Sequence, residues 1–181
     1  MFVIAFSVSL AALCTGIVLG YSSMDPAGGD GAWAGSGGQP AEISFASSFG
    51  PILVRNTGAA MLLFSGVLTA GFSTVVALGL MAAYIGATFG AAAHTAGFQE
   101  ALGSIVLYAP LEFVGLLLAA TAGMLPVVVG VANALRSSAE DGRSPLRAYA
   151  ESVALSLKTL GVAVAVILIA ALAESVVIAA R

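Results

Sequence analysis

The chain has 181 residues, of which 60% are hydrophobic and only 8% are charged, and its formal net charge is −3. A soluble domain carries about 25% charged residues, so this chain has too little charge to cover a globule in water. The composition therefore excludes a soluble protein and indicates an integral protein of the lipid bilayer. The few basic residues form no run, so nucleic-acid binding is not expected.

Five segments are long and apolar enough to cross a bilayer, since a spanning helix needs about 20 mostly apolar residues. We expect these helices at residues 2–21, 51–72, 73–93, 102–132 and 152–180. The predicted fold is therefore an all-α, polytopic transmembrane helix bundle of about five spans. The second and third helices are separated only around Gly71, so either a tight hairpin or a pair of re-entrant half-helices fits this region.

Composition divides the chain into three parts. Residues 1–21 form the first transmembrane helix, and we interpret it as retained, because it lacks a basic n-region and a small-x-small cleavage site. Residues 22–50 form a glycine-rich extracytoplasmic loop. Residues 51–181 form the remaining transmembrane core. The loop glycines follow no strand and precede no GK[ST], so they predict no phosphate-binding loop.

The basic residues predict the orientation in the cell membrane. Four of the six basic residues lie between or just inside the last two helices: Arg136, Arg143, Arg147 and Lys158. Cytoplasmic loops carry an excess of Lys and Arg, so this stretch is predicted to be cytoplasmic. Five spans then place the N-terminus in the cytoplasm and the C-terminus outside. Arg55 and Arg181 would lie at the outer face, where they oppose this orientation but are outnumbered.

Polar side chains from three helices are predicted to converge in the outer half of the bilayer. Glu112 would lie roughly 15 Å below the outer end of the fourth helix, and Glu174 roughly 9 Å below that of the fifth. Arg55 and Asn56 enter from the same side at the start of the second helix. A charge at the bilayer centre costs at least ~2.5 kcal/mol, so such residues are expected to face the protein interior and a partner.

Small residues at helical spacing predict close helix contacts. Two ladders show this spacing: Glu112 with Gly115, Ala119 and Gly123 in the fourth helix, and Ala82 with Gly86 and Gly90 in the third. Glu112 is therefore expected on a packed face and not on a lipid-facing one. The ladder of the third helix predicts a contact seam within the bundle or with a second copy.

The role of the two glutamates has two interpretations. Glu112 and Glu174 either contact an ion, a proton or a substrate, or they cap a neighbouring helix or pair with Arg55 to fix helix register. Tyr108, four residues before Glu112, and His94, the sole histidine, are secondary site candidates. A lone histidine without a cysteine cluster predicts no metal site, and no cofactor is expected. HExxH, GxSxG and P-loop motifs do not occur, so enzyme activity is not expected.

Three short motifs carry a family resemblance. They are the asparagine in VRNTGAAMLLFSGVLTAGFST, the glutamate in LYAPLEFVG and the late glutamate in AALAESVV. Over roughly residues 45–181 the chain resembles the stage II sporulation protein M family of multi-pass membrane proteins. The resemblance marks Asn56, Glu112 and Glu174. The chain departs from the family where Leu107, Tyr108 and Ala109 stand in place of a Pro-His-Gly step.

The resemblance implies a membrane subunit of a larger complex, because founding members work with cell-wall hydrolases during engulfment. Other members are associated with ABC-type ATPases or with circular bacteriocins. Three functions remain open on this basis. They are a scaffold that holds partner proteins or a second copy, a transport component with an ABC-type ATPase at the loop from Arg136 to Lys158, and an intramembrane processing, cyclisation, export or immunity factor for a hydrophobic peptide.

Overall fold

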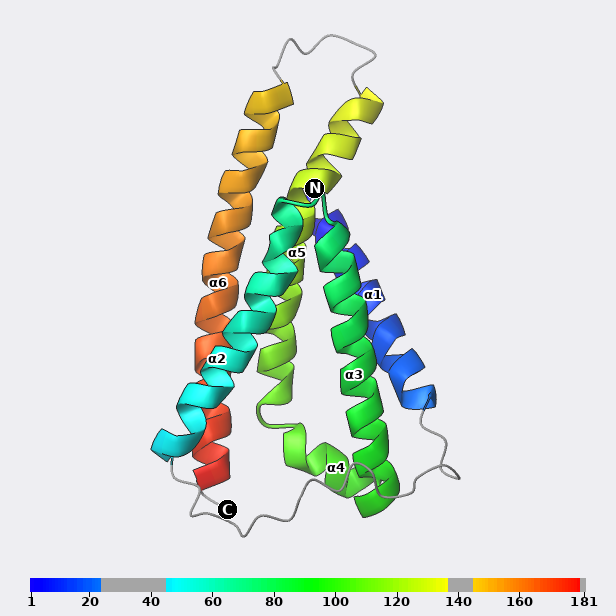
Figure 1. The fold of residues 1–181 in the computed structure, drawn as a ribbon, viewed down its shortest axis with the longest axis vertical. Coiled ribbons are helices and arrows are strands. Elements are labelled where there is room, and N and C mark those ends of the chain that lie inside the picture. The colour runs from blue at the N-terminus through cyan, green and yellow to red at the C-terminus, as the bar shows by residue number, and fades with distance from the viewer. Residues whose placement is uncertain (24–44, 137–144, 180–181) are drawn as a thin grey trace.

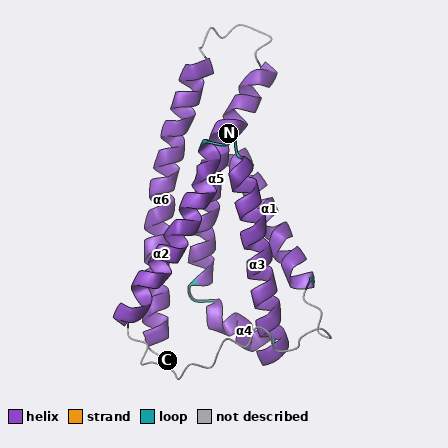
Figure 2. Ribbon diagram, viewed as in Figure 1, coloured by secondary structure: helices purple, strands orange, loops and turns teal. Residues whose placement is uncertain are grey.

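The computed structural model describes residues 1–23, 45–136 and 145–179, and this part of the chain forms helices and no strand (Figures 1 and 2). The α-helices and one 3-10 turn are α1 (Phe2–Ser22), α2 (Phe45–Phe64), η1 (Ser65–Val67), α3 (Phe72–Ala96), α4 (Phe98–Ile105), α5 (Ala109–Arg136) and α6 (Pro145–Ala179). The predicted all-α bundle is confirmed.

The five long helices cross the bundle in alternating directions, and the short α4 lies across its lower end (Figure 1). The principal contacts join α1 to α3 and α5 to α6, and α2 packs on both α5 and α6. The ends of α1, α3 and α6 and the beginnings of α2 and α5 lie at the lower end (Figure 1). Because α2 and α3 are full-length antiparallel helices, the tight hairpin is the correct alternative and the re-entrant one is wrong.

Four helices in the described part of the chain are long and apolar enough to cross a membrane: α1, α3, α5 and α6. α2 has 20 residues, but Arg55 and Asn56 lower its mean hydropathy, so it is not among the four. Its position in the bundle beside α5 and α6 agrees with about five predicted spans.

α2 begins at Phe45, six residues before the predicted position 51. The rings of Phe45 and Phe49 stack with their centroids 5.7 Å apart, and this contact between successive turns stabilises the additional helical segment. Pro51 consequently lies inside α2 and not at its start. The predicted 22–50 loop is shorter than expected at this end, and its residues 24–44 lie outside the described residues.

The hairpin between α2 and α3 depends on left-handed backbone at two residues. α2 ends at Phe64, eight residues before the predicted position 72, and η1 follows. Ala70 has φ 49° and Gly71 has φ 84°, and the Gly71 N–H donates to the Gly66 carbonyl oxygen at 2.7 Å. Left-handed backbone costs roughly 1–2 kcal/mol for a residue with a Cβ, so glycine is suited to position 71. The predicted turn at Gly71 is confirmed.

The predicted continuous helix 102–132 is wrong, because the chain breaks between α4 and α5 at residues 106–108. Pro110 explains the break. Proline has no N–H for a helix interior and disfavours helical backbone in the preceding residue, but it fits the first turn of a new helix. The predicted depth of Glu112 is therefore also wrong, since Glu112 lies in the first turn of α5.

α6 begins at Pro145, seven residues before the predicted position 152. Proline is favourable at the first helical position, where its N–H is not needed. The 35 residues of α6 correspond to about 52 Å, well above the roughly 30 Å of a bilayer core. In Figure 1 the upper parts of α5 and α6 extend beyond the start of α1 and the η1 turn.

Glycines allow α1 and α3 to touch through their backbones. A Cβ on Gly20 would overlap the backbone of Ala83, and a Cβ on Gly86 would overlap the Ile17 carbonyl oxygen. The predicted ladder of Ala82, Gly86 and Gly90 is buried. Since Gly86 faces α1, this seam lies within the bundle.

The predicted ladder of α5 is also a packed face. Gly115, Ala119 and Gly123 are buried. A Cβ on Gly115 would lie 2.6 Å from Ile167 of α6, and a Cβ on Gly123 would overlap the Leu63 carbonyl oxygen of α2. α5 therefore contacts both neighbours through small residues.

We expect Gly86→Ala to destabilise the protein and Gly79→Ala, the control on the same helix, to leave it equally or more stable. The added methyl at position 86 meets backbone atoms of α1, whereas a Cβ at position 79 has no neighbour within 4 Å. Overpacking costs roughly 1–3 kcal/mol. Thermal unfolding in detergent, followed by circular dichroism, measures the difference. Equal midpoints for both variants would contradict the proposed α1–α3 contact.

Candidate functional site

An amide and a carboxyl group from different helices meet inside the bundle. The Asn56 side-chain Nδ2 of α2 donates a hydrogen bond to Glu112 Oε1 of α5 at 2.5 Å. Both side chains are half-buried. This contact brings the beginning of α5 against the middle of α2.

Glu174 of α6 completes the site. Its carboxyl group lies close to that of Glu112 and within electrostatic range of Arg55. We call Asn56, Glu112 and Glu174 the carboxyl cluster. The cluster joins α2, α5 and α6. That these residues form a polar site in the outer half of the bilayer stays a prediction.

Each member of the carboxyl cluster continues the buried face of its own helix. Buried residues recur at helical spacing beside each one: Ala60 and Leu63 after Asn56, Gly115 and Ala119 after Glu112, and Ile167 and Ala170 before Glu174. Residues three, four and seven positions apart lie on one side of a helix. Packing of the apolar faces therefore brings the three polar side chains together.

Arg55 lies at the edge of the site. Its side chain is exposed, and it interacts with Glu174 electrostatically. Within the described ranges, one ion pair has its charged atoms within 4.0 Å of each other. It joins Arg147 Nε to Glu151 Oε1 of α6, at 3.1 Å. The alternative in which Arg55 forms a direct ion pair with a glutamate is therefore not observed.

The two secondary candidates have different positions. His94 lies in the last turn of α3, is exposed, and stacks on Tyr21 of α1 with ring centroids 6.4 Å apart. Tyr108 contacts Glu112 through the backbone, because the Glu112 N–H donates to the Tyr108 carbonyl oxygen at 3.2 Å. His94 thus belongs to an aromatic contact between helix ends, whereas Tyr108 helps to start the helix that carries Glu112.

The sequence did not predict two hydrogen bonds between elements of the bundle. Thr74 is fully buried and donates to the Leu63 carbonyl oxygen at 2.6 Å, which holds α3 against α2. The Tyr149 hydroxyl of α6 donates to the Val67 carbonyl oxygen of η1 at 3.1 Å. Neither contact has a sequence signature, because both acceptors are backbone carbonyl groups in another element.

The cluster can donate and accept hydrogen bonds and can hold a proton. In residues 1–23, 45–136 and 145–179, no group of three or more His, Cys, Asp or Glu side chains is arranged to hold a metal ion. The chemistry that the observed side chains offer is therefore exchange of a proton or of a hydrogen-bond partner at Glu112 and Glu174.

The apolar helices and the buried polar contacts define a multi-pass helical membrane protein. The family profile of Stage II sporulation protein M matches residues 7–177, which covers most of α1 and nearly the whole chain. The chain belongs to this family. No curated protein and no solved structure matches it.

A double-mutant cycle on Asn56→Ala and Glu112→Ala tests the cluster. We expect a coupling of roughly 0.6–1.7 kcal/mol, the range measured for hydrogen bonds between membrane helices. The same cycle on Arg147→Ala and Glu151→Ala is the control, and its coupling is expected near 0.3–0.5 kcal/mol because that pair is exposed. Unfolding free energies in mixed micelles provide the measurement. Zero coupling between Asn56 and Glu112 would exclude the bond.

Proposed function

We propose that the chain is a non-catalytic membrane subunit of a larger assembly, and that the carboxyl cluster is its polar contact for a partner protein. The observation that carries this proposal is that Asn56, Glu112 and Glu174 are only half-buried. They contact one another, but part of each side chain stays exposed. Polar surface is costly inside a bilayer. A partner helix that offers a hydrogen-bond donor or acceptor would cover the part that the bundle leaves open.

Membership of the Stage II sporulation protein M family supports this role, because the family resemblance implies a component of a complex. The cluster also sets the relative height of α2, α5 and α6, so a partner that binds there would contact all three helices. The cytoplasmic side would carry the exposed charges of α6, including Arg147 and Lys158, where an ABC-type ATPase would dock.

The contact between Glu112 and Glu174 supports transport as a second function. Uptake or release of a proton by one of the two neighbouring carboxyl groups would change the charge at the α5–α6 contact. Such a change would couple the arrangement of these helices to proton or solute movement. The hypothesis of a processing, cyclisation, export or immunity factor for a hydrophobic peptide is supported by the family likeness alone.

Glu112→Gln and Glu174→Gln test the proposed function. We expect each to lower the recovery of co-purifying partner proteins from native membranes about tenfold, equivalent to about 1.4 kcal/mol. Glu151→Gln, an exposed acid on α6, is the control and should leave recovery unchanged. Normal assembly with lost solute flux would favour transport instead. Normal assembly with accumulated unprocessed peptide would favour the processing factor.

The proposed orientation has a separate test. In a Cys14→Ser background, Glu100→Cys of α4 and Glu151→Cys of α6 each place one exposed thiol near opposite ends of the bundle. If the N-terminus is cytoplasmic, a membrane-impermeant maleimide should label the cysteine at position 100 in intact cells and the one at position 151 only after lysis. The reverse pattern would invert the topology.

A further inference from the structure

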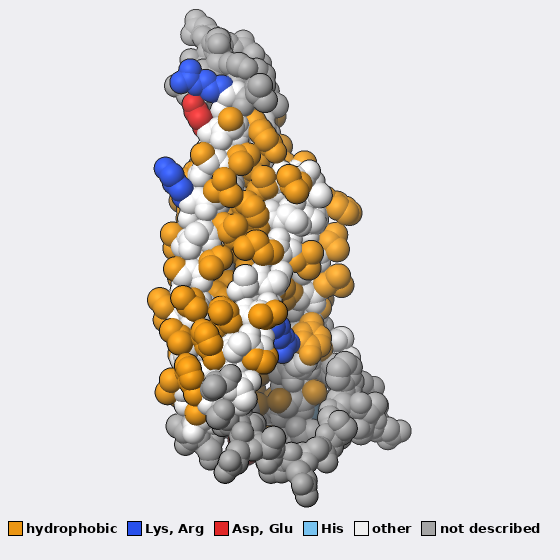
Figure 3. Space-filling view, turned by 60° about the vertical axis from the view of Figure 1, so that its left-hand side comes forward, with side chains coloured by type: hydrophobic (Ala, Val, Ile, Leu, Met, Phe, Trp, Pro, Cys, Tyr) orange, Lys and Arg blue, Asp and Glu red, His pale blue; other side chains and the backbone are white. Residues whose placement is uncertain are grey.

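One face of α6 changes from charged to apolar along its length. Exposed residues at helical spacing on this face are Arg147, Glu151 and Lys158, followed by Val162, Ile169 and Val176. Because all six contact the surroundings and not the bundle, the change after Lys158 marks the upper boundary between water and hydrocarbon. Figure 3 shows charged side chains near the upper end and mostly hydrophobic side chains below them.

The rest of α6 gives the position of the lower boundary. Residues 159–179 correspond to about 31 Å, and the 21 residues of α1 correspond to the same length. Both values match the roughly 30 Å thickness of a bilayer core. The last residues of α1 and α6, which lie toward the lower end of the bundle (Figure 1), therefore mark the depth at which the hydrocarbon ends.

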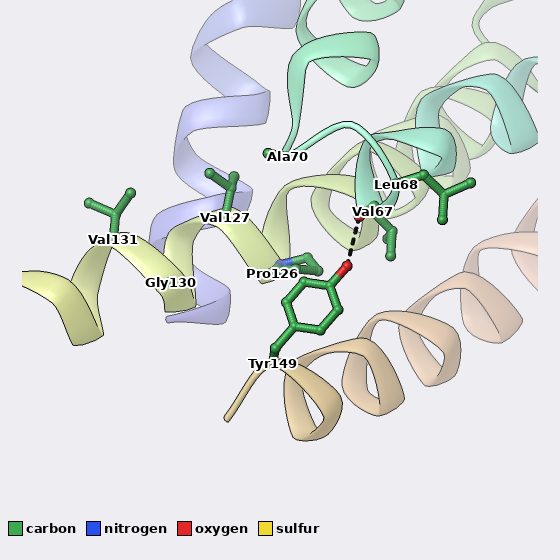
Figure 4. Close-up of a pocket in the computed structure, with 8 residues that line it drawn as sticks. All are labelled: Val67, Leu68, Ala70, Pro126, Val127, Gly130, Val131 and Tyr149. Atoms are coloured by element: carbon green, nitrogen blue, oxygen red, sulfur yellow. Dashed lines mark hydrogen bonds between the residues drawn. The ribbon is translucent and has the colours of Figure 1, made fainter. Parts of the chain in front are cut away.

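An apolar pocket of about 450 Å³ between η1, α5 and the start of α6 lies at the other end of the bundle (Figure 4). Tyr149 forms one wall of this pocket and precedes Lys158 on α6. The pocket therefore lies on the water side of the upper boundary, and the lipid contacts of the bundle lie below it.

The short helix α4 lies across the bundle at the lower boundary (Figure 1). Aromatic rings connect it with the last turns of α1 and α3. Tyr21, next to the last residue of α1, stacks on His94 with ring centroids 6.4 Å apart, and Phe98 of α4 meets Phe89 edge-on at 5.6 Å. Tyrosine is enriched where a membrane meets water. These contacts place the start of α4 at the depth where α1 leaves the hydrocarbon.

One side of α4 is apolar although the bundle does not cover it. Phe98, Leu102 and Val106 are 55%, 42% and 51% exposed, and residues four positions apart lie on one side of a helix. Val106 follows the last helical residue but keeps helical backbone, with φ −58°. Ala101, 5% exposed, faces the bundle beside this apolar side.

The opposite side of α4 is polar. Gln99, Glu100 and Gly103 are exposed and follow one another around the helix on the side away from Leu102. α4 thus has three sides, which face the bundle, carry exposed apolar groups, and carry exposed polar groups. A helix that lies flat at a membrane surface beside a protein meets three such surroundings: protein, hydrocarbon and water.

We propose that α4 is an interfacial helix that inserts Phe98, Leu102 and Val106 into the lipid leaflet at the lower end of the bundle. Its depth selects lipid as the occupant, because α4 lies where α1 and α6 reach the bilayer boundary. Its apolar side is also continuous, through Phe98 and Phe89, with α3, which is long and apolar enough to cross the membrane. α4 contains no Lys or Arg, so its insertion depends on apolar contact and not on anionic headgroups.

This placement has a consequence for the carboxyl cluster. Only residues 106–108 separate α4 from α5, and Glu112 lies in the first turn of α5. Insertion of α4 would therefore fix the depth at which α5 enters the bilayer, and with it the depth of Glu112.

The accessibility of spin labels tests the placement of α4. In a Cys14→Ser background, Leu102→Cys and Val106→Cys carry a nitroxide on the apolar side, and Gln99→Cys and Gly103→Cys carry it on the polar side. Paramagnetic resonance in phosphatidylcholine vesicles measures collisions with oxygen, which concentrates in hydrocarbon, and with a nickel chelate, which stays in water. We expect the ratio of oxygen to nickel collisions to be about tenfold higher on the apolar side, since a leucine-sized group favours hydrocarbon by at least that factor.

Leu80→Cys, at a position 70% exposed on α3, gives the hydrocarbon reference, and Glu151→Cys of α6 gives the water reference. Positions 102 and 106 should approach the first value, and positions 99 and 103 the second. If all four positions of α4 give the water ratio, α4 lies outside the lipid. If labels at positions 102 and 106 collide with neither reagent, a protein surface covers them. Either result would overturn the proposal.

Leu102→Asp tests whether insertion depends on the apolar side. Gly103→Asp is the matched control, because it adds the same charge on the polar side, where a Cβ has free space. The label at position 106 should fall to the water ratio in Leu102→Asp and keep its ratio in Gly103→Asp. An unchanged ratio in a folded Leu102→Asp protein, checked by circular dichroism, would contradict the proposal. The measurement uses no partner protein, so it is independent of the function proposed for Glu112.

Discussion

The bilayer offers no water to polar groups, so each polar side chain within it requires a partner from the protein. Asn56, Glu112 and Glu174 contact one another across three helices, and their contacts hold α2, α5 and α6 at one relative height. Several other buried hydroxyl groups use backbone carbonyls. Thr121 and Ser175 donate to the carbonyl oxygens four residues earlier, each at 2.7 Å. The carboxyl cluster differs from these two, because its partners come from other helices, as the acceptor of Thr74 also does. Both contacts therefore constrain tertiary structure.

Close approach of helices provides the second constraint. Lipid tails are as apolar as leucine, so membrane helices associate through dispersion contacts and hydrogen bonds. Gly20 and Gly86 allow backbone contact between α1 and α3, and Gly123 allows it between α5 and α2. Thr74 adds a hydrogen bond to α2 at the last of these junctions. Small residues thus determine which helices become neighbours, and polar residues determine their relative height.

The carboxyl cluster and the apolar pocket lie toward opposite ends of the bundle. The carboxyl cluster involves the first turn of α5 and the last part of α6, near the lower end. The apolar pocket involves η1 and the first turns of α6, near the upper end. Because α6 contributes Glu174 to one site and Tyr149 to the other, a shift of this helix would affect both.

The amino-acid sequence alone determined the class of protein, the number of apolar segments, the turn at Gly71 and the packed faces that carry Glu112 and Gly86. These properties depend on composition and on spacing within one helix, which are local. It also marked Arg55, Asn56, Glu112 and Glu174 as candidate site residues, because charge in hydrocarbon is costly wherever the helices lie. Tertiary structure decided that Glu112 is hydrogen-bonded to Asn56 and lies close to Glu174, while Arg55 remains at the edge. It also decided how the helix break before Pro110 redirects α4 and how Tyr149 closes a pocket against Val67. Those outcomes depend on distances and angles between helices, which many small contacts set jointly and which no single segment encodes.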